Sequence, residues 1–166
     1  MTIRATQFAV IGALLLLASC TKEQPPPRST IIPSDRVAPS PVGTNQNVLA
    51  KTFNLKTTAT FPFEIPAHAA QPHLHGLFQS FAGQAHGASD DTANIDFLIL
   101  NEEQHTDLVS NRPSEALMSV ENSHTQAINF DFPPSMNNPV RYYLVFRNTE
   151  GSKSSKVVEA NFRLDF

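Results

Sequence analysis

The sequence predicts an all-β protein: an antiparallel β-sandwich of jelly-roll or immunoglobulin-like type, with about seven or eight strands. Alternation of apolar and polar residues with period two is the dominant pattern beyond about residue 50. Every phenylalanine except Phe8 also lies beyond residue 50. Charged residues make up only 16% of the 166-residue chain, which disfavours long helices covered with salt bridges. A closed barrel is the alternative.

Most of the expected strands are marked by alternation. Phe53 and Leu55 alternate with polar neighbours, and the segment 61–66 follows the same pattern. Pro62 and Pro66 in that segment lack the backbone N–H group, so they fit only an edge strand or a strand end. The other expected strands cover 73–81, 95–100, 128–132, 142–147 and 158–166.

The sequence also predicts which strand is central and how several strands are connected. The segment 95–100 is apolar on both faces except at Asp96, as expected for a central strand. Glu102-Glu103 is expected in a solvated turn, and only Glu115–Val120 has the composition of a short helix. Asn148 to Ser155 is expected to join the last two strands as a hairpin.

The N-terminal residues 1–19 have the form of a secretory signal peptide, with Arg4 followed by an apolar run from Phe8 to Ala18. This run is too short to span a bilayer. The segment Leu17-Ala18-Ser19-Cys20 resembles the lipobox of bacterial lipoproteins, and Cys20 is the single cysteine of the chain. The resemblance implies cleavage before Cys20, lipid attachment to its thiol, and anchoring of the protein in a membrane. An ordinary signal peptide or an uncleaved anchor is the alternative.

Residues 20–49 are expected to form a disordered tether, and residues 50–166 the β-domain. Six of the 13 prolines lie between residues 21 and 50, without an aromatic residue or an apolar face. A spacer is therefore favoured over a ligand for proline-binding domains.

The residue after the cysteine is Thr21 rather than the aspartate that resembles an inner-membrane retention signal. The outer membrane is thus favoured if the source is Gram-negative.

Three segments of the expected β-domain resemble segments of known β-sandwich domains. The segment 94–101, NIDFLILN, looks like the central strand of extracytoplasmic bacterial β-sandwich domains, and 142–148 and 155–164 look like their closing hairpin. These domains are similar to the GOLD (Golgi-dynamics) sandwich, a protein-binding module, and more distantly to the pre-peptidase C-terminal domain. The resemblance implies the fold and assigns no functional residue.

A histidine-rich stretch is the best candidate for a chemical site. His73 and His75 are expected on the same face of a strand, where zinc or copper could bind with His86 or Asp90 completing the ligand shell. The alternative is a polar strand face with loop histidines. The oxygen-rich segment Asp90-Asp91-x-x-Asn94-x-Asp96 allows calcium, although it lacks the glycine and final glutamate of an EF-hand. No cofactor is otherwise indicated.

A possible contact surface is expected at Arg141, Tyr143 and Arg147, because tyrosine beside arginine is typical of interface hot spots. An ordinary solvated sheet face is the alternative. Residues 50–166 hold 8 basic and 13 acidic residues, which argues against nucleic acid and anionic lipid as partners. Neither a nucleophile elbow nor a phosphate-binding glycine loop is present, so an enzyme is not expected.

These observations favour a cell-envelope lipoprotein with a β-sandwich that binds or supports an envelope protein or a surface polymer. A metal-binding envelope protein that uses the histidines is the first alternative. A small hydrolase is the second, and it requires a concave site that joins a serine or carboxylate to one of these histidines.

Overall fold

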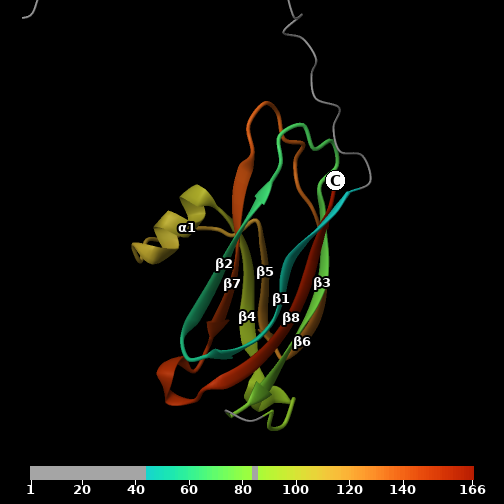
Figure 1. The fold of residues 1–166 in the computed structure, drawn as a ribbon. Helices are drawn as coiled ribbons and strands as arrows, with labels where there is room; N and C mark the ends of the chain where they lie inside the picture. The colour runs from blue at the N-terminus through green and yellow to red at the C-terminus, as the bar shows by residue number, and fades with distance from the viewer. Residues whose placement is uncertain (1–43, 84–85) are drawn as a thin grey trace, which may run out of the picture. The chain divides into compact units, whose positions relative to one another are not determined.

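The fold is a sandwich of two four-stranded antiparallel sheets in a computed structural model that describes residues 44–83 and 86–166. Sheet A has the strand order β1-β8-β3-β6, and sheet B has the order β2-β7-β4-β5 (Figure 1). The expected signal peptide, the lipid attachment site Cys20 and tether residues 21–43 lie outside the described residues. The elements are β1 (Asn45–Leu55), β2 (Thr58–Ile65), β3 (His73–Ala82), η1 (Asp91–Ala93), β4 (Ile95–Asn101), α1 (Glu102–Val109), β5 (Met118–Ser123), β6 (Thr125–Asp131), β7 (Val140–Asn148), η2 (Gly151–Lys153) and β8 (Lys156–Asp165).

The pairing of the strands makes this sandwich a jelly roll. First strand pairs with last and so on inward: β1 with β8, β2 with β7, β3 with β6, and β4 with β5. This is the arrangement of one long antiparallel hairpin rolled into two layers. The further pairs β8–β3 and β7–β4 join two pairs of strands into each four-stranded sheet. The prediction of an antiparallel sandwich is confirmed, in its jelly-roll form.

The connection between β7 and β8 is not the predicted hairpin. β7 lies in sheet B and β8 in sheet A, so the segment between them crosses from one layer to the other. The Asn148 amide orders this crossing by donating hydrogen bonds to the carbonyls of Lys56, Gly151 and Ser154. The alternation located the ends of both strands to within two residues but said nothing about their partners.

The predicted helical segment Glu115–Val120 is also wrong. Met118 begins β5, which pairs with β4 through Met118↔Ile99, so sheet pairing decides the local structure. The helix α1 instead starts at Glu102, where a solvated turn was expected. Asn101 caps it: its side chain accepts from the Gln104 N–H, while the Gln104 side chain accepts from the Asn101 N–H.

The edges of the sheets agree with the proline pattern. Pro62 lies in β2, an edge strand of sheet B, and Pro66 follows its last residue. β1 begins at Asn45, so the folded domain starts before the predicted boundary at residue 50. The residues from Asn45 to Asn47 are exposed and polar, and backbone pairing with β8 rather than burial makes them a strand.

Phenylalanines from both sheets fill the core between the layers. Phe146 from β7 is fully buried and contacts Phe97 beside it and Phe78 and Phe162 across the sandwich, with ring centroids 5.1, 5.9 and 6.3 Å away. Phe97 and Phe162 stack with an interplanar angle of 6°. The core therefore depends on aromatic contacts between the two sheets.

Among the described residues, no helix has the length and apolar character needed to cross a membrane.

Tyr142 makes the stability of this core depend on pH at alkaline values. Its side chain is 5% exposed, and burial raises the pKa of its phenol above the ordinary value. A pKa that is higher in the folded state contributes stability below the unfolded pKa of about 10, and this contribution is lost as the pH rises through the folded value. We therefore expect the urea midpoint of unfolding to fall above about pH 10.

The two tyrosines allow a matched test of this expectation. Tyr142→Phe should lose this part of the alkaline pH dependence, whereas Tyr143→Phe should retain it. The chain has no tryptophan, so phenolate absorbance reports on these two residues alone. The same alkaline profile in wild type and Tyr142→Phe would contradict the assignment.

Candidate binding site

The outer face of sheet A is organised in rows that cross its four strands. In antiparallel strands, directly opposed residues point to the same face. One such row contains Ala50 of β1, Asn161 of β8, Leu77 of β3 and Ala127 of β6. Its end residues are alanines on the two edge strands, and Leu77 is 49% exposed.

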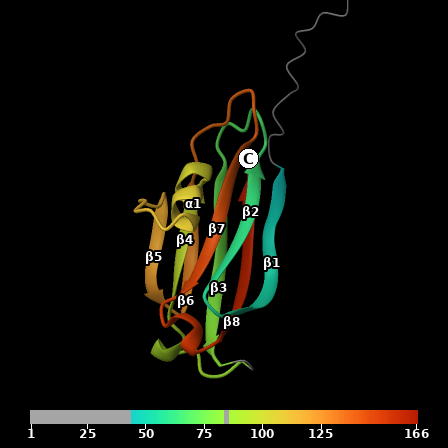
Figure 2. The same cartoon turned by 90° about the vertical axis from the view of Figure 1, so that its left-hand side faces the viewer.

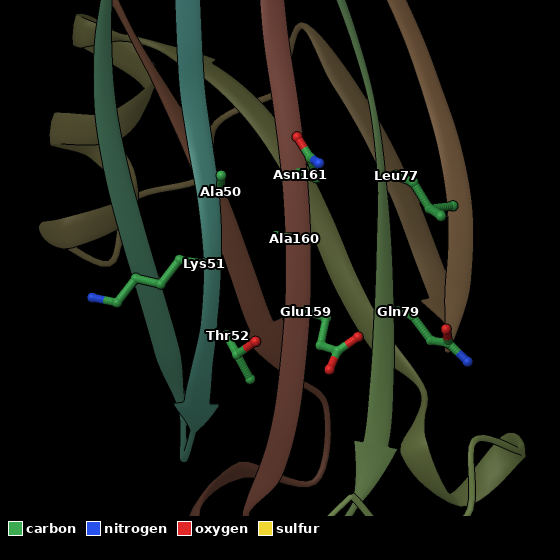
Figure 3. A pocket seen from close by; sticks show the side chains of 8 residues that line it. All are labelled: Ala50, Lys51, Thr52, Leu77, Gln79, Glu159, Ala160 and Asn161. Carbon is green, nitrogen blue, oxygen red and sulfur yellow. The ribbon is translucent and has the colours of Figure 1, made fainter.

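Longer side chains flank this row on both sides. The row below it, Thr52, Glu159 and Gln79, is visible in Figure 3 under the line of Ala50, Asn161 and Leu77. The row above it holds three residues in register: Arg163, His75 and Asn129.

Two shallow hollows adjoin this row, one on each side of Leu77 and Asn161, and together we call them the transverse trough. One part of it, about 430 Å³, lies over β1, β8 and β3, and a second part of about 470 Å³ lies over β8, β3 and β6. The two parts share Leu77 and Asn161. Three strand spacings make the combined length of the two parts about 14 Å, from Ala50 on one edge strand to Ala127 on the other.

Several polar groups of the trough are free to bind a ligand. Within the part of the chain that the structure describes, the side chains of Asn161, Asn129 and Arg163 have no hydrogen-bond or ion-pair partner. Gln79 donates to the Ser89 hydroxyl at 3.2 Å, and Glu159 contacts the His86 imidazole at 2.8 Å. Asn161 of β8 and Asn129 of β6 lie in adjacent rows with β3 between their strands, and each amide offers both a donor and an acceptor.

The structure divides the predicted metal ligands between two places. His73 and His75 share a face as predicted, and their rings stack with centroids 6.0 Å apart. Each contacts a different carboxylate: His73 that of Asp131 at 2.6 Å and His75 that of Asp165 at 3.3 Å.

His86 lies in the loop after β3, where it contacts Glu159 of β8. Since His75 is in register with Arg163, four residues from Glu159 along β8, about 13 Å of strand separates the two imidazole sites. No three His, Cys, Asp or Glu side chains converge as metal ligands within residues 44–83 and 86–166. The histidines are close in sequence, but the extended strand separates them.

The oxygen-rich segment uses its side chains to hold the loop together. Asp90 accepts from the backbone N–H and hydroxyl of Thr92, which cap η1, and these hydrogen bonds lower the pKa of Asp90. Asp96 accepts two hydrogen bonds from Arg147, at 2.8 and 3.1 Å, and one from the Asn122 N–H. These contacts account for the two carboxylates without a cation.

The predicted contact surface lies on the outer face of β7, where all three of its residues have partners within the domain. Arg141 binds Glu64 at 2.6 Å, and Arg147 binds Asp96. The Tyr143 ring stacks on His105 of α1, with centroids 3.9 Å apart and an interplanar angle of 7°. Figure 2 shows α1 in front of this sheet. A partner at this surface would have to compete with these contacts.

Sequence reasoning did not identify the transverse trough. Its floor joins residues from four segments that lie far apart in the chain, and no motif links them. The available signal was the alternation of β8, which placed Asn161 and Arg163 on the outer face. Their neighbours on that face depend on strand order, which alternation does not reveal.

Comparison with known proteins yields a similarity of fold. No protein-family model and no curated protein sequence matches this chain. Among solved structures, the chain is similar to the carbohydrate-binding module TmCBM61, solved in complex with β-1,4-galactotriose. The TM-score is 0.41 and the sequence identity 9%, over 69% of this chain and 68% of that one.

Proposed function

We propose that this chain is a non-catalytic module of the cell envelope that binds an extended polysaccharide in the transverse trough. The observation that carries the proposal is the reach of the trough, whose two parts together extend from edge strand β1 to edge strand β6. A linear polymer can enter at one edge and leave at the other. Sites for small molecules are, in contrast, mostly enclosed and apolar.

The chemistry of the trough favours a sugar over a protein segment. Its lining combines amide, carboxylate, imidazole and hydroxyl groups and the cations of Lys51 and Arg163 with Leu77, Ile128 and three alanines. Sugar hydroxyls donate and accept hydrogen bonds, so they match the free amides of Asn161 and Asn129. The centre of a protein interface is usually built from aromatic side chains such as tyrosine and tryptophan, and among the described residues none of that kind lines the two hollows.

Binding of the full chain to a panel of polysaccharides tests this function. The panel contains galactan, xylan, a β-glucan, chitin, peptidoglycan and linear polyuronates. We expect retention on at least one of them and a loss of affinity of about tenfold in Asn161→Ala, because one or two hydrogen bonds contribute about 1–2 kcal/mol.

An exposed asparagine in the loop between β6 and β7 provides the control. Asn137→Ala removes the same group away from sheet A and should bind as wild type does. Absence of binding to every polymer, or equal affinities of the two variants, would refute the function.

The envelope location is a separate part of the proposal and rests on Leu17-Ala18-Ser19-Cys20. Two or three acyl chains on Cys20 would hold the module stably at a membrane, the outer one in a Gram-negative cell. We expect mass spectrometry of the membrane fraction to find a lipidated N-terminal cysteine, and Cys20→Ala to leave that fraction. A variant that remains in the membrane with the same acylated N-terminus would contradict lipidation at Cys20.

A further inference from the structure

The arginine of the trough differs from the others of the domain. The chain has four arginines after residue 43, and Arg112, Arg141 and Arg147 each bind a carboxylate at 2.8 Å or less. Arg163 has no such partner within the described residues. Acidic residues outnumber basic ones in this domain, so an unpaired guanidinium is unexpected.

The neighbouring carboxylates on the same face explain why Arg163 is free. Asp165 lies two residues further along β8 and contacts His75, while Glu159 lies four residues back and contacts His86. Both acids are therefore engaged by imidazoles. The residues directly opposite Arg163 are Asn47 and His75, and neither carries a carboxylate.

Arg163 is also placed where a ligand would meet it. It lines the trough together with Asn129 and Asn161, and His75 lies between Arg163 and Asn129 in the row. A guanidinium binds a carboxylate through two parallel hydrogen bonds, and the amides of Asn161 on the same strand and Asn129 two strands away can bind hydroxyls of that sugar or of the next one in the polymer. Lys51 and Glu159 line the other part of the trough, whereas no carboxylate lines the part over β8, β3 and β6 that contains Arg163, within the described residues.

We infer that the transverse trough selects an acidic polysaccharide, with Arg163 binding the carboxylate of a uronic acid residue. This inference rests on the proposed function and adds the charge of the polymer to it. Asn129 and Asn161 bind neighbouring hydroxyls, and Leu77 contacts the apolar face of a sugar ring. The charge contact is exposed, so salt screens it.

The test uses pairs of polymers that differ only in charge. Polygalacturonate, alginate and hyaluronate are each compared with their carboxyl-reduced forms, in which the acid has become a primary alcohol. Equilibrium binding of the full chain is measured at low and high salt. We expect at least one polyuronate to bind about tenfold more tightly than its reduced form at low salt, with a smaller preference at high salt.

Two arginine variants separate a role in binding from a role in folding. Arg163→Gln should lower the affinity for the polyuronate about tenfold and leave the reduced polymer unaffected. Arg141→Gln, which removes an exposed arginine from sheet B, should retain the full preference.

The outcomes distinguish this inference from the proposed function. Equal binding of acidic and reduced polymers, or equal losses on both in Arg163→Gln, would overturn the selection of charge and leave polysaccharide binding intact. If neither these polymers nor any member of the panel binds, both proposals fail.

Discussion

Replacing Phe146 by alanine is expected to lower the free energy of unfolding by about 3–5 kcal/mol, a large part of the stability of a domain of this size. The side chain is fully buried, and its ring contacts five other phenylalanines. They are Phe53, Phe61, Phe78, Phe97 and Phe162. Its removal leaves a cavity between the two sheets that this surrounding framework cannot easily close.

Urea unfolding of wild type and variants measures this loss. Phe81→Ala is the control, because Phe81 is only partly buried on the outer side of sheet A and its one ring contact is with His86. We expect a loss below about 1.5 kcal/mol there, since the truncated site remains next to solvent. Similar losses in the two variants would show that the core is not centred on Phe146.

The substitution Gly76→Ala is expected to destabilise the domain by about 3 kcal/mol, although it adds a single methyl group. Gly76 lies in the middle of β3 and faces inward. A Cβ atom there would lie 2.4 Å from the Asn161 carbonyl oxygen and 2.8 Å from the Phe162 Cα. Both atoms belong to the backbone of β8, which is paired on both sides and cannot move away.

The control for Gly76→Ala adds volume to the opposite face of the same sheet. Ala127→Val lies on the exposed side of the edge strand β6, where added methyl groups meet solvent, and should change stability by less than about 0.5 kcal/mol. The added Cβ atom would press on the backbone carbonyl of Asn161, whose side chain lines the trough. Gly76→Ala should therefore also weaken polysaccharide binding. Unchanged urea midpoints would contradict the tight approach of β3 and β8.

Much of the fold could be predicted from the sequence because burial on one face determines alternation. The proline-bearing edge strand and the last strand were found this way, and the strand at 95–100 was found because it is apolar on both faces. Strand partners could not be found, since alternation identifies which side chains are buried and not which strand lies beside another. The predicted hairpin at residues 148–155 failed for that reason.

The helix α1 was missed although its start is encoded locally. Asn101 and Gln104 stand at the spacing of a capping box, a signal that outweighs the polar composition of Glu102-Glu103. The site was harder to predict. The histidines suggested a cluster because they are close in the chain, whereas the trough brings Ala50 and Ala127 to opposite ends of one row.

The central claim is that the outer face of sheet A binds an extended sugar polymer. Mapping of backbone amide chemical shifts, during titration with an oligosaccharide of the polymer that binds most tightly, tests it most directly. We predict shifts at Ala50, Leu77 and Asn161 and their neighbours in the flanking rows, and unchanged amides on the outer face of sheet B. Shifts centred on Tyr143 and His105, with the amides of the trough unchanged, would contradict the claim.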